Sequence, residues 1–411
     1  MKNTQIQNLL FNLCKFWIFI ALLQSLYAWF TWGQLTKSVI LVITFLHCII
    51  FALSASKYFT VRLANLIPLF LFSIAEFYMM KSSGILNISR AVVQIVIVAF
   101  VLFLTDEYKI ILIRYITIFF AMILSISLIG WILFLLGLSF PHEVIKHPDF
   151  NYWYDNYYIF LADNKGIVPR FCSIFLEPGH LGMITAFLLY ANKFDLKRKA
   201  VLIIFVATIF TFSLAAYVLT FISAASIIII NSERNVSFNI LSKRKIIYGI
   251  LFAIVVSAGV YGFSRYKSGD NVVNRVILSR LKFKNGNISG NDRFSPDFSA
   301  YFNSFKKTKK IVLGIGNEYL HMKWKKGNAG WKVFIVQYGV FGVFLVFIFY
   351  ASVVYFNKSN LAKMFLIIYT LCFLQAAYPL WLGEIFIFIT ALPLFITHEN
   401  NRNHVIQAKS D

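Results

Sequence analysis

The amino-acid sequence predicts an all-α polytopic membrane protein of about 12 transmembrane helices, with a large extracytoplasmic loop that contains an amphipathic helix. Of the 411 residues, 59% are hydrophobic and only 14% are charged, whereas soluble domains are about half apolar and about a quarter charged. Apolar runs of about 18 or more residues, long enough to cross a bilayer as a helix, recur along most of the chain. Several of the short segments between these runs are basic, as is typical of cytoplasmic loops.

Twelve segments are expected to span the membrane. They are 10–30, 37–54, 61–80, 91–105, 110–138, 173–191, 200–210, 212–230, 246–263, 331–356, 362–378 and 380–397. The first segment lacks a small-residue cleavage site and ends in "YAWFTW". We therefore expect a retained helix with an aromatic belt and not a signal peptide.

The number of times that residues 200–230 cross the membrane determines the expected topology. Its flanks, 192–199 and 231–245, are short and basic, which places both of them in the cytoplasm. The chain between them must then cross the membrane an even number of times. We expect two short or tilted helices that turn around 211–213.

With both termini in the cytoplasm, the chain divides into five regions. These are the N-terminal transmembrane helices in 1–138, an outer loop in 139–172, central helices with an Arg/Glu motif in 173–263, a large basic extracytoplasmic loop in 264–330, and C-terminal helices with a cytoplasmic tail in 331–411. The four cysteines are scattered in or beside apolar runs, without a CxxC pair. We expect buried thiols and no disulfide framework, metal site or cofactor.

The large outer loop is strongly basic. Residues 264–330 hold fourteen Lys/Arg against four Asp/Glu. A basic surface beside a membrane attracts a polyanion, a pyrophosphate or anionic headgroups. A solvated face without any ligand has the same composition, so the lysines alone do not decide between these alternatives.

A helix is expected at 295–310, within this loop. Ser295 suits the N-cap and Pro296 the first helical position. The aromatic residues at 298, 301, 302 and 305 share one helical face, which suits either the membrane surface or the helix bundle. Further along, Gly314 and Gly316 allow a tight turn, either an ordinary one or one that presents N–H groups to an anion.

The stretch "RFCSIFLEPGHLG" at 170–182 places charged residues at the mouth of an apolar segment. A helix is expected to begin near Glu177 or Pro178, because proline is tolerated in the first turn. Glu177 then complements the helix dipole, which is its structural interpretation. Ionisable residues at the edge of a span usually face a cavity and pair with each other, so Arg170, Glu177 and His180 also form a candidate site.

Three motifs together resemble the O-antigen polymerases (Wzy) and the wider O-antigen ligase-like family. They are "PRFCSIFLEPGHLGM" (169–183), "TFSLAAYVLTF" (211–221) and the external segment 293–342, which has an arginine, a GxG and an asparagine before a helix. Leu214 replaces the arginine that often follows Thr-x-Ser in the family. Asn328 stands where the ligases typically carry a functional histidine, and His321 lies seven residues earlier.

The resemblance implies a metal-independent glycosyltransferase that polymerises polyprenyl-pyrophosphate-linked oligosaccharide repeat units into O-antigen or capsule. It implies a bacterial inner-membrane protein with an active site that faces the periplasm. The expected general base is Glu177, with His321 or His180 as second choices. The residues expected to bind the pyrophosphate or substrate are Arg170, Arg293, Gly314, Gly316 and Asn328. Aromatic residues in 150–158 and 298–305 are expected to stack on sugar rings or to anchor the surface.

The sequence is also compatible with three other functions. One is an O-antigen ligase that transfers glycan to a lipid A-core acceptor, although Asn328 favours the polymerase. A second is a flippase or transporter for the same lipid-linked unit, and a third is a non-catalytic envelope scaffold. The expected partners are the lipid-linked oligosaccharide, membrane lipids, a chain-length regulator and a flippase, without nucleic acid.

Overall fold

The computed structural model describes residues 2–80, 85–147, 153–163, 170–233, 283–284, 287–288, 295–316, 330–375 and 381–407. The described part is a bundle of mostly apolar helices. Five of its helices are long and apolar enough to cross a membrane: Thr4–Ser25, Leu35–Ser54, Leu63–Met80, Asp106–Leu135 and Trp331–Asn357. The chain is therefore a helical membrane protein by the length and composition of its helices.

The long helices follow the predicted spans closely. They are α1 (Lys2–Ser25), α2 (Gln34–Ser54), α3 (Leu63–Met80), α4 (Ile85–Phe103), α5 (Asp106–Leu135), α6 (Pro178–Ala191), α7 (Lys199–Phe210), α8 (Leu214–Glu233), α14 (Trp331–Asn357), α15 (Asn360–Gln375) and α16 (Leu382–Gln407). Each corresponds to one expected span. The remaining expected span, 246–263, lies outside the described residues.

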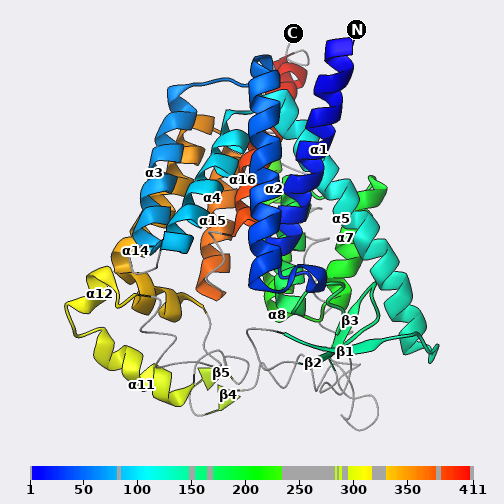
Figure 1. Cartoon of the computed structure of the whole chain (residues 1–411), viewed down its shortest axis with the longest axis vertical. Helices are drawn as coiled ribbons and strands as arrows, with labels where there is room; N and C mark the ends of the chain where they lie inside the picture. The colour runs from blue at the N-terminus through cyan, green and yellow to red at the C-terminus, as the bar shows by residue number, and fades with distance from the viewer. Residues whose placement is uncertain are drawn as a thin grey trace.

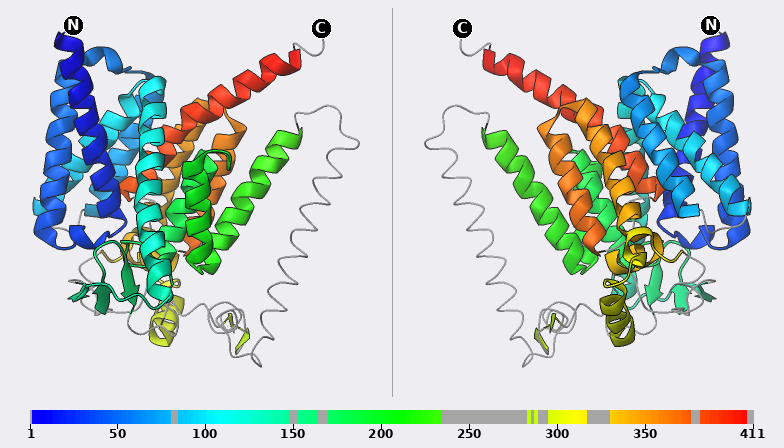
Figure 2. Two further views of the ribbon diagram at one scale, coloured as in Figure 1. Left: turned by 90° about the vertical axis from the view of Figure 1, so that its right-hand side faces the viewer. Right: turned by 90° about the vertical axis from the view of Figure 1, so that its left-hand side faces the viewer.

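The bundle has two distinct ends. The start of α1 and the end of α16 lie at one end, which we call the terminal end (Figures 1 and 2). The small sheet and the short helices α11 (Pro296–Phe305) and α12 (Lys310–Leu313) lie at the other end, which we call the loop end. The described parts of the two loops that are expected on the extracytoplasmic side, 139–172 and 264–330, therefore lie at the same end of the molecule.

The predicted break within 200–230 is confirmed. Helix α7 ends at Phe210 and α8 begins at Leu214, with Phe212 in a left-handed conformation (φ 46°) between them. The Thr211 hydroxyl donates a hydrogen bond to the Thr208 carbonyl at the end of α7. The break therefore satisfies its own polar groups, as a turn within an apolar bundle requires.

The loop end also contains a three-stranded antiparallel sheet that the sequence analysis missed. Strands β1 (Glu143–Lys146), β2 (Trp153–Asn156) and β3 (Leu161–Asp163) pair in the order β1-β2-β3. Strands this short have a weak sequence signal, since they give only one or two alternations of apolar and polar residues. A two-residue pairing, β4 (Phe283–Lys284) with β5 (Asn287–Ile288), is described in the large loop.

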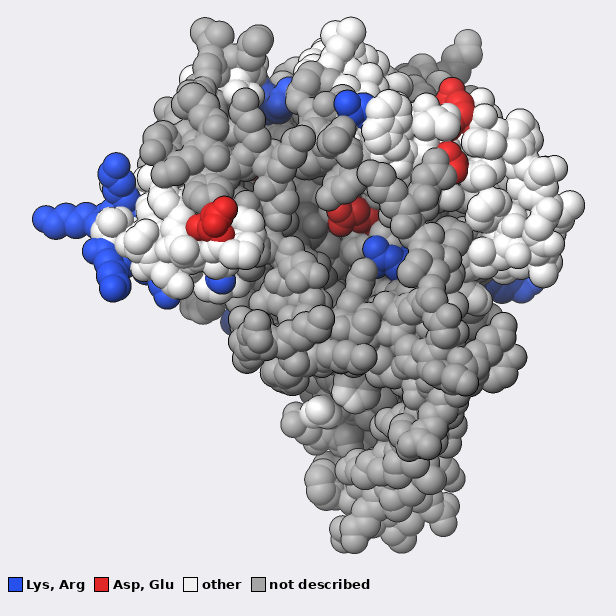
Figure 3. All heavy atoms as spheres, turned by 90° about the horizontal axis from the view of Figure 1, so that it is seen from below, with Lys and Arg blue, Asp and Glu red and all other residues white. Residues whose placement is uncertain are grey.

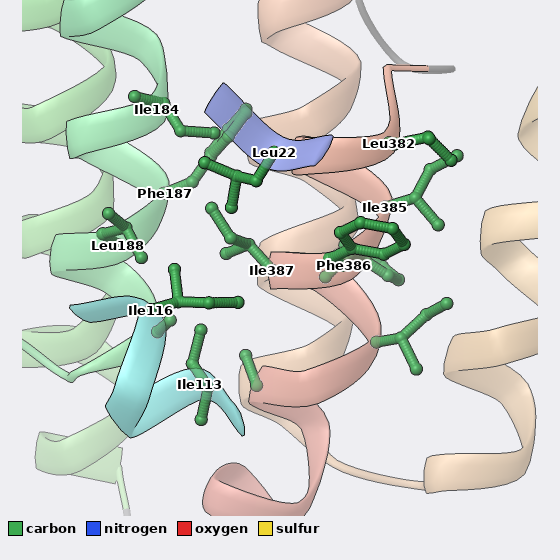
Figure 4. Close-up of a cluster of buried hydrophobic side chains, with 14 of the residues drawn as sticks. Leu22, Ile113, Ile116, Ile184, Phe187, Leu188, Leu382, Ile385, Phe386 and Ile387 are labelled. Atoms are coloured by element: carbon green, nitrogen blue, oxygen red, sulfur yellow. The ribbon is translucent and has the colours of Figure 1, made fainter. Parts of the chain in front are cut away.

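Helix α6 is the centre of the apolar core. All its residues from His180 to Ala191 are buried, and in Figure 4 its side chains point toward residues of α1, α5 and α16. The Phe187 ring stacks on Tyr369 of α15 at 4.2 Å, and Tyr190 stacks on Phe365 at 5.0 Å. In lipid such close packing, and not the hydrophobic effect, holds helices together.

Helix α11 packs on α14. Of the two expected positions for its aromatic face, the membrane surface and the helix bundle, the structure shows the bundle. The Ser295 hydroxyl accepts a hydrogen bond from the Phe298 N–H (3.2 Å), as predicted for the N-cap. Phe298, Phe302 and Phe305 are buried in a cluster with Val336 of α14. These three rings are therefore unable to stack on sugars or to lie on the membrane surface, and that part of the prediction is wrong.

Candidate functional site

The candidate site lies at the loop end, where an extended segment leads into α6. The expected span 173–191 is helical only from Pro178; residues 171–176 are buried and non-helical. Their backbone is held by hydrogen bonds from several elements, including Trp29 N–H to the Ile174 carbonyl (3.0 Å) and Leu161 N–H to the Ser173 carbonyl (2.8 Å). The segment is a rigid support for the residue that follows it.

Glu177 is that residue. It occupies the N-cap position of α6, but its side chain makes no capping hydrogen bond. The side chain is 49% exposed, and its Oε2 atom lies 3.9 Å from Nε2 of His180, whose side chain is only 8% exposed. The carboxylate is thus held at the edge of the bundle with one oxygen directed at a buried imidazole. Side-chain capping does not explain this residue.

Aromatic residues surround His180. Its ring lies 5.2 Å from Trp381, just before α16, in an edge-on arrangement, and 6.1 Å from Tyr27, in the connection between α1 and α2. The Lys37 ammonium lies 4.8 Å from the centre of the Tyr27 ring. Tyr27 and Trp381 are both half-buried, so they form a partly open aromatic wall next to the Glu177–His180 pair.

A second histidine extends this wall. His147 is fully buried and lies 4.6 Å from the ring of Trp32 and 5.9 Å from that of Tyr27. Tyr27 and Trp32, expected in an aromatic belt at the end of the first span, are half-buried and pack on this histidine, and the belt itself stays a prediction. The sequence gives no local signal for this grouping, since its members come from distant segments.

The first two resembling motifs are in contact. A Cβ atom built on Gly182 of α6 would lie 2.3 Å from Cβ of Ala216 and 3.5 Å from Cβ of Ser213. Glycine at this position therefore permits α6 and α8 to approach each other closely. The contact brings the turn at 211–213 next to the beginning of α6.

Arg170 lies at the other end of the rigid segment. It is half-buried, and the next residue, Phe171, donates its N–H to the Phe210 carbonyl at the end of α7 (3.2 Å). Within the described ranges no ion pair joins Arg170 to Glu177 or to another carboxylate. Arg170 and Glu177 thus share one support and one end of the molecule without an ion pair between them.

Charged side chains are spread over the loop end (Figure 3). Near the middle of this face an acidic and a basic side chain lie next to each other (Figure 3). Further basic side chains gather at the edge where α11 and α12 lie; Lys306, Lys307, Lys309 and Lys310 are all exposed there. Basic charge therefore borders the loop end without being confined to the candidate site.

The glycines of the GxG motif have a structural role. Both have positive φ (71° for Gly314 and 86° for Gly316). Gly316 N–H donates to the Gln337 carbonyl (2.9 Å), Gly314 N–H to that of Lys310 (2.7 Å) and the N–H between them to that of Val336 (2.9 Å). The prediction that this turn presents free N–H groups to an anion is wrong, because all three already bind protein carbonyls.

Three expected site residues lie outside the described residues: Arg293, His321 and Asn328. Of the expected residues that are described, Glu177 and His180 come together, whereas Arg170 and the two glycines do not join them. Burial, with a contribution from Asp155, raises the pKa of Tyr157 in the neighbouring sheet segment. That phenol is therefore not a competing base near neutral pH.

No protein-family model, curated protein or solved structure matches the chain.

Proposed function

We propose that this protein is a glycosyltransferase of the bacterial inner membrane that polymerises lipid-linked oligosaccharide repeat units into a surface polysaccharide. The donor is a glycan attached to polyprenyl pyrophosphate, and the acceptor is a sugar hydroxyl of a second lipid-linked unit. The reaction takes place at the loop end, which faces the periplasm. The active site is the group formed by Glu177, His180 and the aromatic wall.

The observation that carries the proposal is the position of Glu177. A half-exposed carboxylate stands on a rigid segment, 3.9 Å from a buried histidine and beside half-buried Tyr27 and Trp381. Aromatic faces stack well on the apolar faces of sugars, and a fixed carboxylate is a suitable general base. The pair therefore fits a site that receives a sugar hydroxyl and removes its proton.

The chemical step balances with these groups. Glu177 takes the proton of the acceptor hydroxyl while that oxygen forms a bond to the anomeric carbon of the donor. The bond from the anomeric carbon to the pyrophosphate oxygen breaks, and polyprenyl pyrophosphate leaves with the electron pair. Arg170, at the same end of the bundle, is proposed to stabilise this leaving group as a cation.

The orientation in the membrane follows from the loop charges. The connections at the terminal end carry basic residues in short turns, among them Lys57, Arg62, Lys197, Arg198 and Lys358. Short basic loops stay in the cytoplasm. The terminal end is therefore cytoplasmic in this proposal, with 12 spans and with the basic edge at α11 and α12 attracting the anionic donor in the periplasm.

The test is a reaction of the purified protein with lipid-linked repeat units, with and without a chelator. We expect a ladder of polymer that survives chelation, and a loss of rate of about 10²- to 10⁴-fold for Glu177→Gln, the usual contribution of a general base. Asp297→Asn is the matched control, because Asp297 is an exposed carboxylate at the same end.

Three outcomes would overturn the proposal. One is an unchanged ladder with Glu177→Gln in correctly folded protein. Another is transfer only when a lipid A-core acceptor is added, which would identify a ligase. The third is movement of the lipid-linked unit across vesicles without any polymer, which would identify a flippase.

A further inference from the structure

A polar cavity lies at the terminal end of the bundle, whereas the candidate site lies at the loop end. It has a volume of about 640 Å³ and is lined by Lys57, Tyr58, Thr60, Arg62, Thr105, Asp106, Glu107 and Tyr108. Its volume is in the range of small-molecule sites. None of these residues takes part in the proposed glycosyl transfer.

The floor of the cavity is a fixed structure. The connection between α2 and α3 pairs with the turn between α4 and α5, because Thr60 N–H donates to the Phe103 carbonyl (2.8 Å) and Thr105 N–H to that of Tyr58 (3.0 Å). The Tyr58 and Tyr108 rings lie 4.4 Å apart across this junction. The charged residues therefore stand on a preformed support and not on independent loops.

The charges in the cavity are divided by sign. The α2–α3 connection supplies the cations Lys57 and Arg62, and the first turn of α5 supplies Asp106 and Glu107. Among the described residues no ion pair joins these cations to these carboxylates; Asp106 instead lies 4.0 Å from Lys109. The cavity thus offers cationic and anionic groups at the same time, which suits a zwitterion better than a simple anion.

Exposed apolar residues adjoin the cavity residues along the chain, and we call Leu53, Val61 and Leu63 the apolar rim. Leu53, Val61 and Leu63 stand at the adjoining ends of α2 and α3 and are 82%, 70% and 67% exposed. Large apolar side chains this exposed at the end of a membrane span face lipid. A ligand with an apolar chain next to a charged group fits this rim, whereas a water-soluble zwitterion leaves it uncovered.

We propose that this cavity binds the headgroup of a phospholipid that carries a primary ammonium, as in phosphatidylethanolamine. Arg62 and Lys57 bind the phosphate, and Glu107, with Asp106, accepts hydrogen bonds from the ammonium. The acyl chains lie against Leu53, Val61 and Leu63. Carboxylates in the first turn also complement the α5 dipole, but this role does not require the facing cations or the apolar rim.

The test is native mass spectrometry of the full-length protein with equal amounts of phosphatidylethanolamine, phosphatidylcholine and phosphatidylglycerol of the same acyl chains. We expect preferential retention of phosphatidylethanolamine. Phosphatidylcholine has no N–H to donate to a carboxylate, and phosphatidylglycerol has no cation. Arg62→Gln should weaken retention of both phosphatidylethanolamine and phosphatidylglycerol at least about tenfold, the effect of losing one charge-assisted hydrogen bond.

The double variant Asp106→Asn, Glu107→Gln discriminates further, because it should reduce phosphatidylethanolamine to the level of phosphatidylcholine and leave phosphatidylglycerol unchanged. Lys358→Gln, at an exposed lysine in another turn of the same end, is the control and should change nothing. A preference that survives this double variant, or stronger retention of phosphatidylglycerol by the unaltered protein, would overturn the proposal. Equal competition by free phosphoethanolamine would show that the ligand is not a lipid.

The lipid test is independent of the glycosyltransferase proposal. Glu177→Gln should keep the lipid preference, so failure of the glycosyltransferase proposal and failure of the lipid proposal are distinguishable.

Discussion

Two glycines of the same helix have different roles. Gly182 lies against α8, where an added Cβ would be 2.3 Å from Cβ of Ala216. Gly179, three residues earlier, has no such neighbour within 4 Å. The first glycine is required by packing between helices, and the second is not.

This difference predicts the effect of two matched substitutions on thermal stability. Gly182→Ala should destabilise the purified protein by about 1–3 kcal/mol, the usual cost of overpacking a core. Gly179→Ala should be neutral or slightly stabilising, because alanine favours a helix over glycine. Thermal unfolding followed by tryptophan fluorescence measures both. Equal stability of the two variants would show that α6 and α8 are not in close contact.

The sequence predicted the centre of the candidate site but not its surroundings. Glu177 and His180 are separated by three residues, so a helix that begins at Pro178 brings them together. Tyr27 and Trp381 belong to two other segments, and only the tertiary structure places them beside His180. The role of Arg170 toward Glu177 stays a prediction, since no ion pair joins the two among the described residues.

At the scale of elements, α11, α12 and the beginning of α14 form one docked unit. Helix α14 is kinked at Gly339, whose φ of 70° and ψ of 178° are not helical. An added Cβ there would lie 2.1 Å from the Val312 carbonyl oxygen of α12, and one on Gly314 2.3 Å from the Gln337 oxygen. The Tyr78 hydroxyl of α3 donates to the carbonyls of Leu313 and Tyr338, which ties the unit to the bundle.

Gly339→Ala should therefore release α12 from α14. An alanine at this positive φ costs about 1–2 kcal/mol, and the clash is with backbone atoms that have no room to move. Hydrogen exchange of the Ile315 and Gly316 amides should become faster, because their hydrogen bonds to the Val336 and Gln337 carbonyls depend on this contact. Val340→Ala is the control, since that side chain is 49% exposed. Unchanged exchange in the Gly339 variant would contradict the docking.

The sequence predicted those elements best whose apolar pattern extends over many residues. The spans and the break at 211–213 follow from apolar length and loop charge, which act over many residues. The polar segment 105–109 is mostly the first turn of α5, with Thr105 at the N-cap. The sheet β1-β2-β3 was missed because its strands have three or four residues, too few to show a period.

At the scale of the whole molecule, successive long helices run in opposite directions (Figure 1). Connections that are distant in the sequence therefore lie at the same end of the bundle. The pairing of Phe59 with Leu104 and the hydrogen bond from Tyr190 to the Leu361 carbonyl (2.8 Å) join connections at the terminal end. The sheet, the rigid segment 171–176 and α11 occupy the loop end (Figure 1). The two proposed sites therefore lie at opposite ends of the bundle, the glycan site at the loop end and the lipid site at the terminal end.

This arrangement predicts the accessibility of introduced thiols. The four native cysteines are all buried, so a membrane-impermeant maleimide should label only added ones. Lys307→Cys, after α11, should be labelled in whole cells, because the proposed orientation places the loop end in the periplasm. Lys358→Cys and Lys197→Cys, in two turns of the terminal end, should be labelled only after lysis. All three positions are exposed, so differences in labelling report the side of the membrane. Labelling of Lys307→Cys and Lys358→Cys from the same side would contradict the topology, because an odd number of crossings must separate them.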